Sequence, residues 1–286
     1  MGDDMTLQAA AELLGVHYMT AYRYVRLGLL PATKLGSTWR VAHADLTAFR
    51  TAPSPSALPA RQTGARTAPW AARFESRLLA GDGGGSWGVV EAALTAGMEP
   101  DEVYLDVIAP SLRGVGDRWA AGEIDVATEH RASGIAMRVV GRLGPRLARR
   151  GRTRGVIVVG TPAGEQHSLP VALLADLLRS GGWEVSDLGC DVPPESFAGE
   201  AGRTERLVAV GVSVTSPSCL ASAAVTIATL RAALGSTPVL VGGGAVPTAA
   251  VAREIGADGW APDGRAALAA LDALAPARPS SDGLAG

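Results

Sequence analysis

The sequence is poor in aromatic residues and cysteines and has no long uninterrupted apolar run. Aromatic residues make up 5% of the 286 residues, while alanine and glycine are abundant, which favours close-packed helices and tight strand-to-helix turns over a β-sandwich. Cys190 and Cys219 match no zinc pattern and exclude a disulfide scaffold, so we expect a reducing compartment. Residues 1–6 are acidic and contain no signal-peptide core, and no run is long enough to cross a bilayer. We therefore expect a cytoplasmic protein with no membrane partner.

The charge balance is close to neutral, and this excludes a polycation. The formal net charge is -2, so any contact with nucleic acid has to come from a local basic patch. Apolar residues make up 47% of a chain whose length suits two or three compact domains.

Composition divides the chain into three blocks, a linker and a tail. The linker is rich in Pro, Ser, Ala and Thr, and the last residues predict disorder. The middle block has helical periodicity and ends in a strongly basic stretch, Arg142 to Arg154. The predicted parts are a DNA-binding domain (1–52), a linker (53–69), a helical domain similar to a four-helix bundle (70–150), an α/β domain (151–275) and a disordered tail (276–286).

The first block has the pattern of a helix-turn-helix. A helix beginning at Leu7 closes at Gly15, and a second runs from Tyr18 to Leu27 with Ala21 inward and Arg23 outward. Thr33 to Val41 predicts a hairpin that turns at Gly36-Ser37, and Asp45 is placed to cap a last helix.

This block resembles the MerR-type, excisionase-like winged helix-turn-helix in its Ala-Glu-Leu-Leu-Gly-Val helix, Tyr-Arg helix, Gly-Leu-Leu-Pro exit and Trp-Arg wing. The resemblance implies that the second helix enters the major groove of operator DNA and that the wing contacts phosphates, as Arg and Lys are suited to do. A solvated helix face that docks protein is the alternative for the arginines. The implied DNA-binding residues are His17, Tyr18, Thr20, Tyr22, Arg23, Arg26, Lys34 and Arg40.

The third block alternates β-rich runs with amphipathic helices, which is typical of a doubly wound, Rossmann-like parallel sheet. Strands are expected at 156–159, 207–213 and 238–241, and helices at 171–179 and 221–234. Ligands of such sheets bind beyond the carboxyl ends of the strands, where Glu165 and His167 follow the first strand. A surface histidine and a generic phosphate loop are the simpler interpretations of these features.

The order Glu-x-His, then Ser213-Val-Thr215, then Gly242-Gly243-Gly244, resembles the cobalamin-binding domain of methionine synthase and its relatives. The resemblance implies that His167 is the lower axial cobalt ligand, that Glu165 orients it, and that Ser213 and Thr215 line the cofactor's buried nucleotide tail. It implies that Gly242 and Gly243 let the backbone approach that tail. The family commonly has Asp where Glu165 stands and Gly where Pro170 stands, although Pro is tolerated in the first turn of a helix.

The middle block selects a subtype of corrinoid protein. Trp119 ends a helix, Gly122 breaks the chain, and Asp125 caps a helix that carries Val126, Glu129 and His130 on one face. This spacing closely resembles the CarH-type light-dependent repressors. The resemblance implies that Trp119 and Val126 pack around a 5′-deoxyadenosyl group, that Glu129 binds it, and that His130 coordinates cobalt from above after photolysis. A core Trp with a surface Glu-His pair is the simpler alternative.

The sequence thus predicts a transcriptional repressor rather than an enzyme, with adenosylcobalamin as its chromophore. By the resemblance, a dark homotetramer binds operator DNA, and light cleaves the cobalt–carbon bond and dissociates it. Two alternatives remain: a corrinoid methyl-carrier protein of a methyltransferase system, and a light-independent, cobalamin-sensing regulator.

Overall fold

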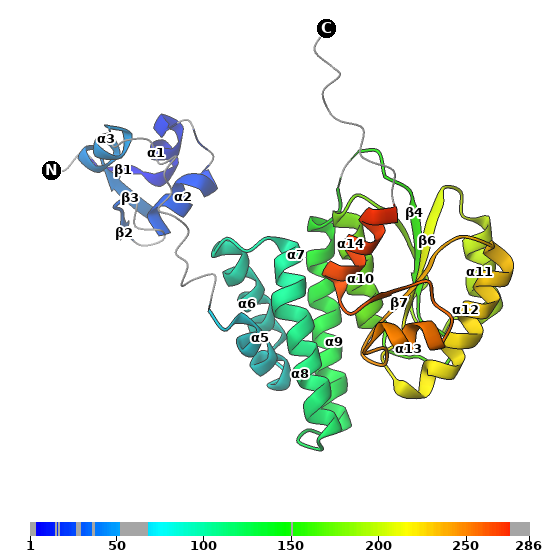
Figure 1. Cartoon of the computed structure of the whole chain (residues 1–286). Helices are drawn as coiled ribbons and strands as arrows, with labels where there is room; N and C mark the ends of the chain where they lie inside the picture. The colour runs from blue at the N-terminus through cyan, green and yellow to red at the C-terminus, as the bar shows by residue number, and fades with distance from the viewer. Residues whose placement is uncertain are drawn as a thin grey trace, which may run out of the picture. The chain divides into compact units, whose positions relative to one another are not determined.

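The structure is a computed structural model of the chain, and it separates into two compact units, residues 1–63 and 64–286. It describes residues 4–14, 16, 18–26, 30–35, 38–51, 68–149 and 151–274 (Figure 1). For Met19, Thr20, Arg23, Arg26 and Thr51 it describes the backbone alone. The predicted linker therefore falls mostly, and the predicted tail wholly, outside the described residues.

Within its described residues, unit 1 packs three helices against a small antiparallel sheet of order β1-β3-β2. Its core contains Leu7, Ala21, Leu30 and Val41, all at most 1% exposed. Two details differ from the sequence prediction: β1 pairs with β3, and Asp45 lies inside the first turn of α3 instead of capping it. The elements are β1 (Asp4–Thr6), α1 (Leu7–Leu14), α2 (Tyr18–Arg26), β2 (Thr33–Leu35), β3 (Thr38–Ala42) and α3 (His43–Thr51).

The first part of unit 2 is a helical bundle around an apolar core that includes Phe74, Leu78 and Val107. Asp82 and Asp125 cap the starts of α6 and α9 by accepting backbone N–H groups. A π-helical turn, η1, interrupts the third long helix. The elements are α5 (Trp70–Leu79), α6 (Gly83–Thr95), α7 (Pro100–Val103), η1 (Tyr104–Ile108), α8 (Ala109–Ala120), α9 (Val126–Leu143) and the 3₁₀ turn η2 (Gly144–Arg146).

The second part of unit 2 is a five-stranded parallel sheet of order β5-β4-β6-β7-β8 with helices on both faces. This confirms the doubly wound fold. The elements are β4 (Val156–Gly160), α10 (Ser168–Ser180), β5 (Glu184–Asp187), α11 (Pro194–Arg203), β6 (Leu207–Ser213), η3 (Pro217–Cys219), α12 (Leu220–Leu234), β7 (Val239–Gly242), α13 (Ala249–Glu254), β8 (Gly259–Ala261) and α14 (Gly264–Leu274).

Helix α10 joins the bundle to the sheet. Alternate residues of β4 face opposite sides, so Ile157 packs on the α10 and α14 side and Val158 on the α11 and α12 side. One stripe of α10, including Val171, packs on the sheet, and another, including Leu173, enters the core of the bundle. Figure 1 shows α10 between α9 and the strands. The helix that begins at the candidate cobalt ligand is therefore held on both sides.

One described stretch, Pro217–Leu234, is long and apolar enough for a membrane span by length and composition, with a mean hydropathy of 1.4. We expected no such stretch from the sequence. In the structure its helix α12 packs Ala223, Ile227 and Leu230 against the sheet. Core helices of soluble proteins satisfy the same criterion, so this is weak support for a membrane segment.

Candidate functional site

The candidate site lies where the connections of the sheet change direction. From β4 the chain passes through α10 to β5 on one side, and β6 adds on the other side of β4. The loops after β4 and β6 therefore start at the switch point of the sheet, at its carboxyl edge, which is where doubly wound folds bind ligands.

Glu165, on the loop after β4, connects the two loops. It is 1% exposed, and its Oε2 accepts hydrogen bonds from the backbone N–H groups of Thr215 (2.8 Å) and Ser216 (2.7 Å) on the loop after β6. Burial by itself raises the pKa of Glu165. The hydrogen bonds from Ser216, His167 and Thr215 outweigh burial, so its pKa lies below the ordinary value and the carboxylate is ionised.

His167 stands at the N-terminal end of α10 with its ring directed by Glu165. Its Nδ1 lies 2.5 Å from Glu165 Oε1, and its backbone N–H donates to the same oxygen at 3.1 Å. A proton on Nδ1 bridges to the carboxylate, which leaves Nε2 as a lone-pair donor on a side chain that is 54% exposed. Pro170 lies in the first turn of α10, so the helix accommodates it as expected.

This donor set fits a cobalt ion that a corrin ring already holds. No described group of three or more His, Cys, Asp and Glu side chains forms a cage for a bare metal ion. A single oriented imidazole is what a macrocyclic metal needs from the protein, because the ring supplies the equatorial ligands.

Three residues that the sequence interpretation missed hold this loop in place. Asp191, at φ 58°, accepts from Gly164 N at 2.7 Å and donates its own N–H to Thr161 Oγ1 and to the carbonyl of Glu165. Thr161 Oγ1 donates to the same carbonyl at 2.9 Å. Ser216 was the third, as a backbone donor. The local signal for Thr161 was a polar residue directly after a buried strand, while Asp191 follows β5, a strand that we did not predict.

Ser213, Thr215, Gly242 and Gly243 lie at the carboxyl ends of β6 and β7, as their positions predicted. Ser213 is 8% exposed, and Thr215 is half-buried. Packing within the fold already requires glycine at both positions, without a cofactor tail. A Cβ at Gly242 would lie under 3.0 Å from the Ala261 carbonyl oxygen, and a Cβ at Gly243 would clash with the Val214 backbone.

The second group of predicted residues lies at the junction of α8 and α9. Trp119 ends α8, Gly122 turns the chain at φ 74°, and Asp125 accepts Thr128 N–H at 2.8 Å at the start of α9. The prediction of this helix break is confirmed.

Trp119 and Val126 are 51% and 55% exposed, which is unusual for large apolar side chains that lie so close in the chain. Glu129 accepts a hydrogen bond from Ser133 Oγ at 2.6 Å, and its Oε2 lies 2.7 Å from His130 Nδ1. The His130 side chain is exposed, and its Nε2 is not engaged by Glu129. Figure 1 shows this junction at the lower end of the helical bundle, and α13, which follows the carboxyl end of β7, in the lower part of unit 2.

The predicted DNA-binding residues are described only in part. His17 lies outside the described residues, and so do the side chains of Thr20, Arg23 and Arg26. Tyr18 stacks on Tyr22 with ring centroids 6.4 Å apart, and Tyr22 meets the wing at Trp39.

Lys34 and Arg40 lie on opposite faces of the wing. Lys34 pairs with Trp39 across the β2–β3 ladder, and Arg40 is the next residue along β3, so their side chains point to opposite sides. The Arg40 guanidinium donates to the Asp4 carbonyl at 3.3 Å.

Comparisons with known families match all three parts of the chain. A B12 binding domain family matches residues 155–272, a second B12 binding domain family matches 70–143, and a helix-turn-helix domain family matches 5–53. The fold class predicted from the sequence is thereby confirmed, and so is a corrinoid as the cofactor.

Several named relatives are corrinoid proteins. The chain is 32% identical to the dimethylamine corrinoid protein of Methanosarcina barkeri, over 60% of this chain and 82% of that protein. It is 32% identical to a corrinoid protein of Desulfitobacterium hafniense, over 51% and 70% of the two chains. The fold of the Methanosarcina barkeri monomethylamine corrinoid protein matches with a TM-score of 0.62 at 21% identity, over 70% of this chain and 96% of that one.

Proposed function

Because the chain belongs to the family of B12-binding corrinoid proteins, we propose that it is a corrinoid-dependent transcription regulator. The observation that carries this is the helix-turn-helix domain match at residues 5–53 in the same chain as both B12 binding domains. The dimethylamine corrinoid protein aligns with only 60% of this chain. A carrier needs no DNA-binding domain, whereas a regulator needs both parts. We place it in the cytoplasm, where operator DNA and a reducing environment occur together.

The finer proposal is that the corrinoid is adenosylcobalamin and that light is the signal. When bound, adenosylcobalamin supplies a cobalt–carbon bond that visible light cleaves. Trp119 and Val126 offer exposed apolar surface to cover an adenosyl group, and the Glu129 carboxylate is a hydrogen-bond acceptor for it. His130 keeps an accessible imidazole for cobalt, and a dark homotetramer gives the repeated DNA-binding units that specific affinity requires.

The test compares one preparation in darkness and after green light. We expect the adenosylcobalamin-loaded protein to be a larger oligomer in the dark, to bind a DNA duplex selected from a random pool, and to lose both properties on illumination. His130→Ala should remove the stable two-histidine absorption spectrum of the lit form, and His167→Ala should do likewise. Arg113→Ala, an exposed change on α8, is the matched control. An unchanged oligomer with unchanged DNA binding contradicts light control.

The same preparation distinguishes a light-independent regulator. In that case DNA binding depends on whether cobalamin is present at all, and equal amounts of bound DNA are recovered in the dark and in the light.

A corrinoid methyl carrier is the second candidate, and the named relatives favour it over light-controlled repression. The dimethylamine corrinoid proteins of Methanosarcina barkeri and Methanosarcina mazei align over 82% and 81% of their lengths, at 32% and 30% identity. A carrier accepts and donates a methyl group, which a regulator need not do. Measured methyl transfer from a methylated amine to the reduced, corrinoid-loaded protein by a partner methyltransferase supports this candidate. Its absence, together with cofactor-dependent DNA binding, supports the regulator.

A further inference from the structure

A long segment of unit 2 carries positive charge without a compensating carboxylate in its own sequence. Between Glu129 and Glu165 there is no Asp or Glu, but the segment contains Arg131, Arg138, Arg142, Arg146, Arg149, Arg150, Arg152 and Arg154. Arg142 lies in the last turn of α9, and the five arginines after it fall between the end of α9 and the start of β4. The candidate cofactor site uses none of them.

Two of these arginines, Arg142 and Arg154, each lie over an aromatic ring and pair with a carboxylate. Arg154 is 18% exposed, forms an ion pair with Asp272 and lies 4.3 Å from the Trp183 ring centroid. Arg142 lies 3.8 Å over the Trp87 ring and 3.9 Å from Glu91, although its side chain remains 61% exposed.

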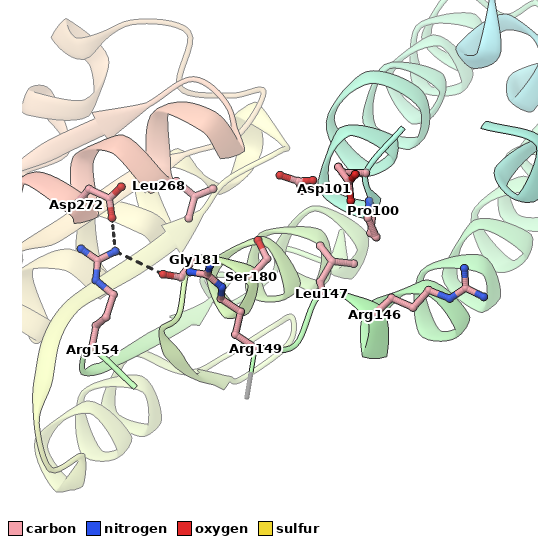
Figure 2. Close-up of a pocket in the computed structure, with 11 residues that line it drawn as sticks. Pro100, Asp101, Arg146, Leu147, Arg149, Arg154, Ser180, Gly181, Leu268 and Asp272 are labelled. Carbon is pink, nitrogen blue, oxygen red and sulfur yellow. Dashed lines mark hydrogen bonds and ion pairs between the residues drawn. The ribbon is translucent and has the colours of Figure 1, made fainter. Parts of the chain in front are cut away.

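Arg146, Arg149 and Arg152 are exposed, and within the described parts of the chain none of them forms an ion pair. Arg146 and Arg149 line an open cavity of about 490 Å³ together with Arg154 (Figure 2). Glu99 and Asp101 also line it, and they limit the local excess of positive charge. We call Arg142, Arg146, Arg149 and Arg152 the basic surface.

The basic surface lies at the end of unit 2 opposite to the cofactor site. Helix α9 starts beside the candidate upper-face residues and ends at Leu143, and the chain then leads through η2 to the amino end of β4. His167 lies beyond the carboxyl end of the same strand. A polyanion bound at the basic surface therefore leaves the corrinoid face accessible.

We propose that the basic surface binds the phosphate backbone of duplex DNA, as a contact additional to the helix-turn-helix. The proposal rests on the DNA-binding function proposed above. Guanidinium groups pair with phosphate in a bidentate manner, and backbone contacts of this kind carry no sequence information. A duplex fits better than a single strand, because single-strand sites present aromatic rings for stacking and Trp87 beneath Arg142 is only 8% exposed.

The number of contacts sets the expected effect. Each phosphate neutralised on duplex DNA contributes about 0.9 to the slope of log affinity against log salt concentration. Loss of the three unpaired arginines should therefore lower the magnitude of that slope by about 3 and weaken binding about tenfold or more at roughly 0.1 M salt.

The experiment measures binding of the full chain, loaded with cobalamin in the dark, to a mixed-sequence duplex of about 40 base pairs over a salt series. The test variant is Arg146→Gln/Arg149→Gln/Arg152→Gln. The matched control is Arg113→Gln/Arg203→Gln/Arg253→Gln, which removes the same charge from exposed arginines elsewhere in unit 2. The corresponding triple Arg→Lys variant should restore the slope, because it restores the charge.

A test variant with the slope and affinity of the control overturns the proposal. The variant Lys34→Gln/Arg40→Gln distinguishes failure of the basic surface from failure of the proposed function. If this double variant binds DNA like the wild type while the Arg→Gln test variant binds more weakly, the helix-turn-helix assignment fails and the basic surface stands. If the wild-type chain does not bind DNA at all, both proposals fall. Cobalamin absorption and the thermal midpoint confirm folding, and loss of the slope in the folded triple Arg→Lys variant also contradicts the proposal.

Discussion

At the scale of single residues, Glu165 is the most constrained charged group of the site. It is 1% exposed, yet each of its oxygens has a partner: Oε2 accepts from Thr215 and Ser216, and Oε1 faces His167. A buried carboxylate is stable only when its acceptors are filled in this way. Glu165 therefore joins the loops after β4 and β6 before any corrinoid binds.

Replacing Glu165 by Gln should destabilise the cofactor-free protein by about 1–3 kcal/mol, because the new amide presents N–H groups to donors and the charge-assisted hydrogen bonds are lost. Urea unfolding of unit 2 measures this. Glu200→Gln, which breaks an exposed ion pair with Arg203, should cost less than about 1 kcal/mol. Equal losses in the two variants would show that Glu165 does not join the loops.

The three consecutive glycines at the end of β7, Gly242 to Gly244, are not equivalent. Gly243 has φ 104°, and a Cβ there would lie under 3.0 Å from Val214 backbone atoms. At Gly244 the nearest atom, the Thr215 carbonyl oxygen, is 3.7 Å from an added Cβ, which is an ordinary contact. Gly243 is needed for the fold, as Gly242 is, and Gly244 leaves room for a side chain.

Gly243→Ala should therefore destabilise unit 2 by about 2 kcal/mol or more, because a left-handed backbone conformation and a backbone clash both oppose the methyl group. Gly244→Ala should lie within about 0.5 kcal/mol of the wild type. Thermal unfolding of the two cofactor-free variants provides the comparison, and similar midpoints would refute this assignment of strain.

At the scale of elements, the sequence predicted the strongly patterned segments and missed the short or polar ones. The strand 207–213 was predicted with the bounds that the structure has, and α10 and α12 to within three residues, because their apolar periodicity is clear. β5 (Glu-Val-Ser-Asp) is a polar edge strand, and β8 has three residues. α11 begins at Pro194, after Pro193 at its N-cap, and contains two glycines, which lower its helix propensity.

Contacts between residues far apart in the chain could not be predicted from local sequence patterns either. The Tyr104 hydroxyl, on η1, donates to Asp176 Oδ2 of α10 at 2.8 Å and lies 3.1 Å from the Val140 carbonyl oxygen. Burial, followed by the neighbouring Asp176 charge, raises the pKa of Tyr104 far above its ordinary value, so the hydroxyl stays protonated and donates. This bond connects residues 72 positions apart, which no spacing rule reveals.

The start of α6 offers a pH test, because three glycines form its first turn and Asp82 caps it. Asp82 Oδ1 accepts Gly85 N–H at 2.7 Å, and mainly this bond lowers the pKa of Asp82 below its ordinary value. A carboxyl whose folded pKa is depressed contributes stability above its unfolded pKa, and this contribution is lost as the pH falls through the folded pKa.

Asp82→Asn keeps a good capping side chain but removes the charge. We expect Asp82→Asn to be less stable than the wild type near neutral pH and to approach it as the pH falls through the depressed folded pKa of Asp82, since the wild-type carboxyl becomes protonated there. Asp82→Ala should stay below the wild type throughout the series. Urea midpoints across the pH series measure this, and a constant difference between wild type and Asp82→Asn would contradict it.

At the scale of the whole molecule, the sequence predicted the order of the domains and the Glu165–His167 pair. It did not predict the residues from neighbouring loops that hold this pair in place. Glu165 and His167 are two residues apart, so a local motif identifies them. Thr161, Asp191 and Ser216 meet them only because β4 is flanked by β5 and β6, and that arrangement follows from the non-local packing of the sheet. The domain boundaries and the assignment of light as the signal stay predictions.

The division into residues 1–63 and 64–286 leads to a last prediction. Units with separate apolar cores unfold as separate cooperative transitions, and a ligand stabilises only the unit that binds it. Calorimetry of the full chain should therefore show two transitions. Hydroxocobalamin at roughly 100 times its Kd should stabilise the unit 2 transition by about 2.7 kcal/mol and leave the other in place. Duplex DNA should raise the smaller, unit 1 transition, and His167→Ala should reduce the cobalamin effect. A single transition that shifts as a whole with cobalamin would contradict this prediction and would mean that the two units are thermodynamically coupled.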